Sequence, residues 1–161
     1  MRFGLLFVLL LGLSSCTSSS NSSGGDKEDR AMFAPVALRV HPVFTEPKDW
    51  TGDGKVDGIE ALIELTDNFG DPTKARGQIV FELFQLRRFN PDPRGQPLET
   101  WTMPLCSLVE QKEHWRRIGG AYAFQLPFPQ LSGYGTTVLS AEMTLAAGGR
   151  LRDQMVLAPR R

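Results

Sequence analysis

The chain has 161 residues, of which 41% are hydrophobic and 22% are charged, and its 18 basic and 18 acidic residues balance to a formal net charge of zero. This balance excludes a general electrostatic attraction to nucleic acid, so no nucleic-acid partner is expected. The length suits one domain with a hydrophobic core of its own.

The first fifteen residues have the composition of a secretory signal. Arg2 precedes an apolar run over residues 3–13, and the small residues Ser14 and Ser15 lead directly to Cys16. The run is shorter than the roughly 20 apolar residues of a membrane-spanning helix, so cleavage is predicted. Ordinary secretory cleavage would leave a free thiol near the N-terminus, in a compartment where oxidants act on it.

These residues resemble the lipobox of bacterial lipoproteins, in which the cysteine is diacylated and becomes the mature N-terminus. The resemblance implies a signal peptide over residues 1–15, a lipidated Cys16 and attachment to the membrane through the lipid. A single acyl chain binds a membrane only marginally, whereas the several chains of this family anchor it permanently. By the family's sorting rule Thr17, which is not aspartate, favours the outer membrane where the source has two membranes.

Residues 16–31 are predicted to form a flexible tether. Residues 17–25 are serine- and glycine-rich, residues 26–30 are mostly charged, and Ala31 is the first apolar residue after Cys16. Such a segment buries too little surface to become ordered, and a coil of this length spans roughly 20 Å. One folded domain is therefore expected over residues 32–161.

The periodicity of this domain is mostly that of β-strands, predicted over residues 36–40, 59–66, 79–84, 98–103, 122–126, 139–145 and 151–157. Residues 79–84 are apolar on both faces, which favours a central strand. Pro97 and Pro104 bound the fourth strand, and Gly148 and Gly149 predict a hairpin between the last two. The pattern predicts an all-β fold, a single antiparallel β-sandwich of about seven strands.

One short helix is expected between the fourth and fifth strands. Ser107 and Glu110 have the spacing of a capping box, and Gly119 suits the helix C-terminus. Cys106, just before this helix, is interpreted as a small buried core residue. Once Cys16 is lipidated, Cys106 has no partner for an internal disulfide.

The segment between the second and third predicted strands resembles the hairpin of bacterial immunoglobulin-like domains. In that family a strand ends in D-x-x-G-x-P and the next begins G-x-V-x-F. Asp67, Gly70 and Pro72 match the first pattern, and Gly77 opens the second after a somewhat longer spacing. The resemblance implies an immunoglobulin-like sandwich and no particular activity.

Residues 49–60 (DWTGDGKVDGIE) match the template of a calcium-binding loop. Calcium takes six to eight oxygen ligands around a tightly turned backbone, and Gly54 stands where the chain must turn. The ligand positions are filled by Asp49, Thr51, Asp53, Lys55 (through its backbone carbonyl), Asp57 and Glu60. The loop is similar to those of EF-hands and dockerins, which implies one structural calcium ion with a weak affinity of about 10⁻⁴ to 10⁻³ M.

The flanks of this loop leave a second interpretation open. The upstream segment contains proline and the downstream one alternates like a strand, so Glu60 would lie on a strand instead of a helix. Residues 46–72 contain eight acids and two bases, whereas residues 73–161 contain seven acids and twelve bases. That acidic excess suits a calcium site, and it equally suits a solvated, glycine-rich hairpin that binds no metal.

The sequence contains little that indicates an enzyme. Neither His41 nor His114 is joined to a nucleophile or a second ligand by a recognisable motif, so both are interpreted as surface or capping residues. The predicted function is a non-enzymatic binding, scaffolding or assembly module. The alternative is a cell-envelope hydrolase that acts on glycan or peptide through Asp53, Asp57 and His114.

The partner of such a module would be an envelope protein or a glycan. Trp50, Trp101 and Trp115 would support a glycan if they formed an aromatic platform. Tryptophans in a domain of this size more often belong to the core or its rim. The sequence is compatible with either role for the tryptophans and does not identify the partner.

Overall fold

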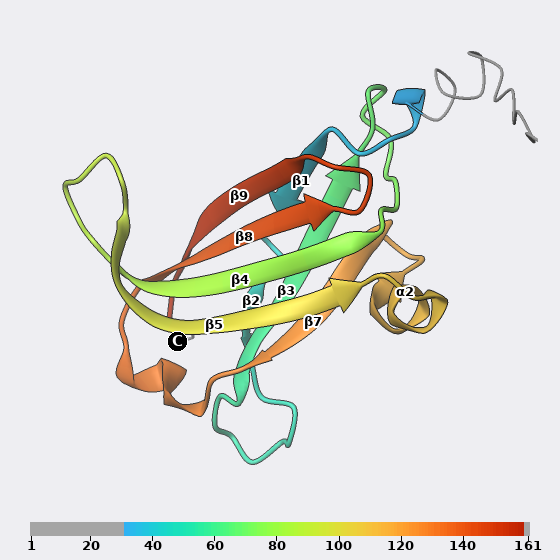
Figure 1. Ribbon diagram of the computed structural model, residues 1–161. Helices are drawn as coiled ribbons and strands as arrows, with labels where there is room; N and C mark the ends of the chain where they lie inside the picture. The colour runs from blue at the N-terminus through green and yellow to red at the C-terminus, as the bar shows by residue number, and fades with distance from the viewer. Residues whose placement is uncertain (1–30, 160–161) are drawn as a thin grey trace, which may run out of the picture.

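The computed structural model of the chain describes residues 31–159 (Figure 1). The predicted signal peptide, the lipidation at Cys16 and all of the tether except Ala31 lie outside the described residues and stay predictions. Within residues 31–159, no helix has the length and apolar character needed to cross a membrane.

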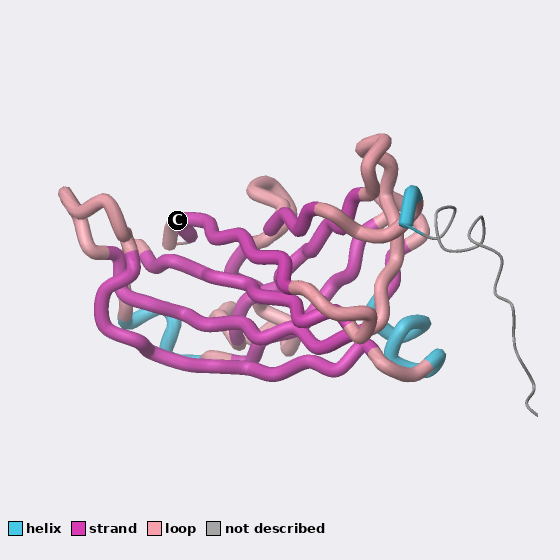
Figure 2. The backbone as a smooth tube through the Cα atoms, turned by 45° about the horizontal axis from the view of Figure 1, so that its top comes forward, coloured by secondary structure: helices cyan, strands magenta, loops and turns pink. Residues whose placement is uncertain are grey.

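Two antiparallel sheets pack face to face, as the two layers in Figure 2 show. The first sheet has the order β1–β3–β7–β6, with β2 also paired to β3, and contains β1 (Ala37–Val40), β2 (Glu46–Lys48), β3 (Gly58–Thr66), β6 (Trp115–Arg116) and β7 (Ala121–Pro127). The second has the order β5–β4–β8–β9 and contains β4 (Gly77–Leu86), β5 (Arg94–Leu105), β8 (Thr137–Leu145) and β9 (Arg150–Leu157). The predicted all-β sandwich is confirmed.

The core lies between the sheets because alternate residues of each strand are apolar and point inward. On β3 the inward residues are Ile59, Ala61, Ile63 and Leu65, all fully buried. The ring of Phe81 on β4 faces the ring of Phe124 on β7, with centroids 5.2 Å apart. As predicted from its two apolar faces, β4 is central, between β5 and β8.

The prolines beside the fourth predicted strand do not end it. β5 extends over Arg94–Leu105, so Pro97 and Pro104 lie within the strand. β5 is an edge strand that pairs only with β4, so its other side is not hydrogen-bonded to any strand. A proline whose nitrogen points to that side costs the sheet no hydrogen bond. Two short strands, β2 and β6, have no predicted counterpart, because two or three residues are too few to show an alternation.

The helix α2 (Leu108–His114) begins where the capping box predicts. The hydroxyl of Ser107 accepts a hydrogen bond of 3.2 Å from the N–H of Glu110, whose carboxylate accepts one of 2.7 Å from the N–H of Ser107. The helix ends at His114, so the expected C-terminus at Gly119 is wrong. The chain continues into β6, and Gly119, at a φ of 93°, lies in the turn to β7, where a left-handed backbone favours glycine.

The expectation that Cys106 is buried is also wrong, since this free cysteine is exposed. It follows Leu105, the last residue of β5, whose side chain is fully buried. Successive residues of an extended backbone point to opposite sides, so Cys106 faces outward. Its Sγ atom lies 3.3 Å from the carbonyl oxygen of Gly77.

The segment that resembles an immunoglobulin hairpin is not a hairpin here. β3 and β4 belong to different sheets, so the connection between them crosses the sandwich. Asp67 organises the first part of this connection, because its Oδ1 atom accepts hydrogen bonds from the N–H groups of Phe69 (2.9 Å) and Asp71 (3.1 Å).

Candidate functional site

The first nine residues of the predicted calcium loop, 49–57, join the antiparallel strands β2 and β3, and the last three, 58–60, belong to β3. The carboxylate of Asp49 accepts hydrogen bonds from the N–H groups of Gly52 (2.6 Å) and Gly54 (2.8 Å), which hold the pKa of this carboxyl below its usual value. Both glycines have positive φ angles, 76° and 85°. The template glycine Gly54 therefore does what the sequence predicts, since it turns the chain around Asp49.

The other end of the loop is held by Asp57. Its Oδ2 atom accepts hydrogen bonds from the N–H groups of Trp50 (2.7 Å) and Thr51 (3.0 Å). The hydroxyl of Thr51 in turn donates to Oδ1 of Asp49 at 3.3 Å. The structure thus brings the three predicted ligands Asp49, Thr51 and Asp57 together.

The other predicted ligands are Asp53, Lys55 and Glu60. Asp53 and Lys55 are at the exposed tip of the loop, where Oδ1 of Asp53 accepts a hydrogen bond of 2.9 Å from the N–H of Lys55. Glu60 lies on β3, with its carboxylate 3.4 Å from the ammonium of Lys48. No group of three or more histidine, cysteine, aspartate or glutamate side chains within residues 31–159 is arranged to hold a metal ion. Calcium binding by this loop stays a prediction.

The residues of the hydrolase alternative are not gathered into one site. Nδ1 of His114 lies 3.1 Å from the carbonyl oxygen of Ala123, and its ring packs on Phe124 with centroids 4.5 Å apart. Asp57 belongs to the other end of β7, where its carbonyl oxygen accepts a hydrogen bond of 2.9 Å from the N–H of Phe128. The five residue-to-residue steps from Ala123 to Phe128 extend over about 17 Å, too far for an acid–base pair.

The tryptophans do not form an aromatic platform either. One face of Trp115 is covered by the ammonium of Lys74, 4.4 Å from the ring centroid, and the ring packs on Tyr122 at 5.0 Å in an edge-on arrangement. Trp101 donates a hydrogen bond of 3.2 Å from Nε1 to the carbonyl oxygen of Pro127. The third tryptophan, Trp50, is in the 49–57 loop, so the three side chains lie in different parts of the sandwich.

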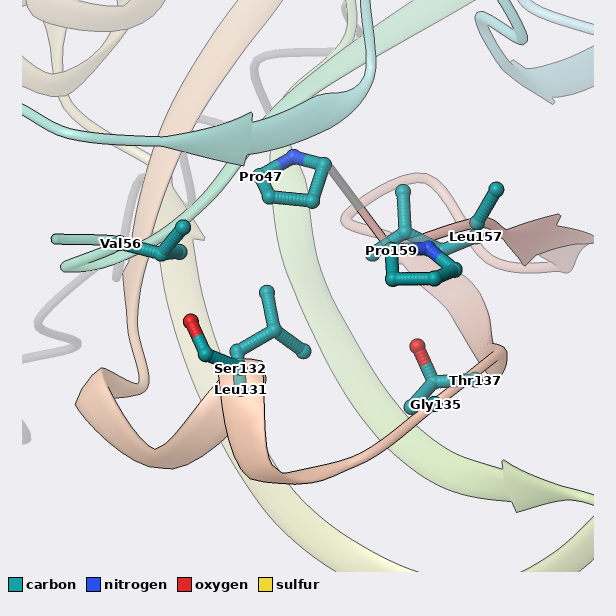
Figure 3. Close-up of a pocket in the computed structure, with 9 residues that line it drawn as sticks. Pro47, Val56, Leu131, Ser132, Gly135, Thr137, Leu157 and Pro159 are labelled. Atoms are coloured by element: carbon teal, nitrogen blue, oxygen red, sulfur yellow. The ribbon is translucent and has the colours of Figure 1, made fainter. Parts of the chain in front are cut away.

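A small cavity lies where η1 (Pro129–Gly133) meets the ends of β2, β8 and β9 (Figure 3). Its volume is about 80 Å³, and Pro47, Leu131, Thr137 and Leu157 are among the residues that surround it. The buried hydroxyl of Thr137 has no hydrogen-bond partner among the described residues. The volume matches two or three water molecules at about 30 Å³ each, which is too small for a sugar or a peptide.

A larger hollow lies on the outer face of the first sheet, and its apolar lining consists of Phe44, Leu62, Trp115, Ile118 and Ala121. Its volume is about 540 Å³. A second hollow adjoins it and shares Phe44, Leu62 and Arg116 with it. We call the two adjoining hollows together the β3–β7 groove. Leu62 of β3 and Ala121 and Ala123 of β7 lie in it.

One wall of the groove is a bulge, residues 41–45, that interrupts the edge strand. β1 pairs with β3 up to Val40, and β2 resumes the pairing at Glu46. Across the gap the hydroxyl of Thr45 accepts a hydrogen bond of 3.0 Å from the N–H of Leu62 and lies 3.5 Å from its carbonyl oxygen. Because Thr45 is only 3% exposed, its hydroxyl takes the place of a backbone ladder bond in the sheet.

The bulge presents two apolar side chains to solvent. Val43 is 71% exposed and Phe44 is 59% exposed. Nδ1 of His41 accepts hydrogen bonds from the N–H groups of Val43 (3.2 Å) and Phe44 (3.3 Å), which confirms His41 as a capping residue. Its ring also packs against the ring of Phe44, with centroids 4.7 Å apart. The exposed tip is therefore held by specific contacts.

The opposite wall is β6 and the turn that follows it. Ile118, at the tip of this turn, is 97% exposed. Arg116 donates a hydrogen bond of 2.9 Å from Nη1 to the carbonyl oxygen of Glu113, the next-to-last residue of α2. Arg116 and its neighbour Arg117 both line the groove. The helix therefore fixes one of the two arginines beside the apolar floor.

The charges of the groove are unequally paired. Each glutamate that lines it has a basic side chain nearby: Glu64 has Arg39 at 3.8 Å and His41 at 3.6 Å, and Glu46 and Glu60 have Lys48 at 3.3 and 3.4 Å. Neither Arg116 nor Arg117 has a carboxylate within 4 Å in the described part of the chain. Arg116 and Arg117 are therefore the unpaired charges on the β6 wall of the groove, whereas Glu46 and Glu60 share the one ammonium of Lys48.

The sequence contains one signal for this groove. On the outward face of β3, Leu62 stands between Glu60 and Glu64, an apolar exception on an otherwise polar face. The walls come from residues 41–45 and 115–119, which no local pattern connects. Comparison of the chain with protein-family models, with curated proteins and with solved structures finds no match.

Proposed function

We propose that this chain is a lipid-anchored, extracytoplasmic binding module without catalytic activity, and that it recruits a protein of the bacterial envelope to the β3–β7 groove. The observation that carries the proposal is the groove itself. Its apolar floor lies between the exposed apolar tips of Phe44 and Ile118 and is bordered by charged side chains. An apolar centre with arginine and aromatic residues inside a polar rim is typical of protein interfaces.

A protein partner fits this surface better than a glycan does. A sugar ring stacks on an open aromatic face, and Trp115 has one face under Lys74 and packs edge-on against Tyr122. Phe44 is then the remaining aromatic side chain in the groove, and it packs against the ring of His41. The exposed aliphatic residues Val43 and Ile118 favour contact with apolar side chains of another protein.

The anchor and the calcium ion complete the proposal. The lipobox-like residues before Cys16 support attachment to a membrane, and the composition of residues 17–30 supports a flexible tether. Calcium would bind weakly in the 49–57 loop through side-chain oxygens of Asp49, Thr51, Asp53 and Asp57 and the backbone carbonyl of Lys55, and would fix the β2–β3 hairpin. Because Glu60 is engaged with Lys48, a water molecule or Asp57 would take its place as a ligand.

Photocrosslinking in intact cells tests the proposal. A photoreactive amino acid is placed at Val43 or at Ile118, one on each wall, and at Phe89 as a matched control. Phe89 is also a fully exposed apolar residue, but it lies in the connection between β4 and β5, outside the groove. We expect the same envelope protein to be crosslinked from both groove positions and not from Phe89.

A second variant shows whether the groove itself binds this protein. Leu62→Arg places a charge on the apolar floor and should abolish the crosslink from Ile118 while the chain stays folded by circular dichroism. Different proteins crosslinked from Val43 and Ile118, or equal crosslinking from Phe89, would contradict the proposal. So would a crosslink that survives Leu62→Arg.

A further inference from the structure

We infer that the β3–β7 groove takes an extended peptide segment in which carboxylates stand next to large apolar side chains. This inference rests on the proposed function and specifies the chemistry of the partner. Its basis is the juxtaposition of an apolar floor at Leu62 with the unpaired guanidinium groups of Arg116 and Arg117.

The sign of the charge follows from the pairing of the groove residues. The carboxylates of Glu46, Glu60 and Glu64 lie on the β2–β3 side of the groove, each within 4 Å of a basic group of the same chain, with Lys48 shared by two of them. Arg116 and Arg117 have no such partner in the described part of the chain. A guanidinium next to an apolar surface binds a carboxylate well, because the carboxylate can take two parallel hydrogen bonds.

The shape of the groove favours a peptide over an acyl chain. From Glu60 to Glu64 the groove follows five residues of β3, a span of about 13 Å, which five residues of extended peptide also cover. A pocket for a small amphiphile encloses most of its ligand. This groove is instead an open depression whose walls end in exposed apolar tips, so side chains of a passing segment can dock between them.

Both walls are held in place before a partner arrives. His41 and Thr45 hold the bulge that carries Phe44, and the carbonyl of Glu113 holds Arg116. Binding therefore loses little conformational entropy on the side of the groove. Most of the conformational entropy lost on binding is then that of the partner segment. This loss is smallest when the segment is short, so we expect a short linear motif.

Selection from a displayed library of random octapeptides by the full chain in detergent tests the inference. We expect the selected peptides to be enriched in aspartate or glutamate next to leucine, isoleucine or phenylalanine. The affinity of a selected peptide, measured by fluorescence anisotropy, should fall about tenfold or more in Arg116→Gln/Arg117→Gln, because two charge-assisted hydrogen bonds are lost. High salt should weaken binding to the unchanged chain more than to this variant.

The matched control is Arg87→Gln/Arg88→Gln. These arginines are another adjacent pair, in the connection between β4 and β5, and they do not line the groove. The control removes the same total charge, so the affinity should change less than twofold if contact, and not net charge, is responsible. Equal losses in the two double variants would overturn the inference.

Other results would also overturn it. Selection of basic or uncharged peptides, or no selection at all, would show that the segment has different chemistry. Displacement of a selected peptide by laurate or by phosphatidylglycerol vesicles would identify an anionic lipid as the occupant instead. If the photocrosslinks persist in any of these cases, the groove still binds a protein and only the inferred chemistry fails.

Discussion

The backbone N–H of Val40 donates a hydrogen bond of 2.9 Å to Oδ2 of Asp153. Val40 ends β1 of the first sheet, and Asp153 lies on β9 of the second. Both strands are at the edges of their sheets, where an unpaired N–H would otherwise be open to another chain. One carboxylate therefore covers an exposed edge and joins the two sheets on the same side of the sandwich.

We predict that Asp153→Ala lowers the free energy of unfolding by about 1–3 kcal/mol, because the partly buried N–H of Val40 loses its acceptor. Asp153→Asn keeps a side-chain oxygen at the same place and should be clearly less destabilising. Urea unfolding followed by circular dichroism measures both. Equal effects of the two substitutions would show that the hydrogen bond contributes nothing to stability.

Thr45→Val should destabilise the chain by about 1–3 kcal/mol, since the isosteric side chain leaves the N–H of Leu62 without its partner. Thr45→Ser retains the hydroxyl and loses one methyl group, worth about 1 kcal/mol. The informative measurement is amide hydrogen exchange at Leu62, which should become faster in Thr45→Val and stay slow in Thr45→Ser. An unchanged exchange rate in Thr45→Val would disprove the role of the hydroxyl.

The capping box of α2 makes stability depend on pH. Hydrogen bonds from Ser107, and also from Cys106, hold the pKa of the Glu110 carboxyl below its usual value of 4.5. Because the pKa is lower in the folded chain, the ionised carboxylate stabilises the fold. This stabilisation is complete above the usual pKa of 4.5 and is lost as the pH falls through the depressed pKa. As the pH falls from the usual pKa through the depressed one, the unchanged chain should lose more stability than Glu110→Gln, measured by urea unfolding at each pH.

Calcium should stabilise the chain if the 49–57 loop binds it. With a dissociation constant of about 10⁻⁴ to 10⁻³ M, about 2 mM calcium adds about 0.6–1.8 kcal/mol to the free energy of unfolding. The thermal transition should then rise on addition of calcium, and Asp53→Ala should remove this rise. Asp71→Ala, which removes an exposed aspartate outside the loop, should keep it; no response in the unchanged chain would leave the loop as a hairpin that binds no metal.

The anchor has a direct test in Cys16→Ser. Without the thiol no lipid can be attached, so the chain should be released from the membrane fraction or accumulate as an uncleaved precursor. Globomycin, which blocks the lipoprotein signal peptidase, should cause accumulation of the precursor of the unchanged chain. Membrane retention of mature Cys16→Ser would show that the chain is held by something other than a lipid on this cysteine.

Most of the sandwich was predictable because its long strands carry their own pattern. The alternation of Ile59, Ala61, Ile63 and Leu65 with more polar residues marks β3, and Ser107 with Glu110 marks the start of α2. The sheet to which each strand belongs was not predictable. The pairing partners of β3 and β4 depend on contacts across the sandwich, which a local pattern does not contain.

The two candidate sites also differ in how far the sequence alone predicts them. The 49–60 motif is contiguous, so its residues could be listed from the sequence, but the engagement of Glu60 with Lys48 depends on the pairing of β2 with β3. The β3–β7 groove combines residues more than seventy positions apart in the chain, such as Phe44 and Ile118. Only the apolar Leu62 between two glutamates hints at it locally.

In the bulge over residues 41–45, the side chains that hold the backbone in place differ from those that face a partner. His41 and Thr45 make the bonds that keep the bulge in place, while the side chains of Val43 and Phe44 face solvent. A substitution at Val43 therefore changes the surface shown to a partner without removing any side-chain bond that holds the bulge.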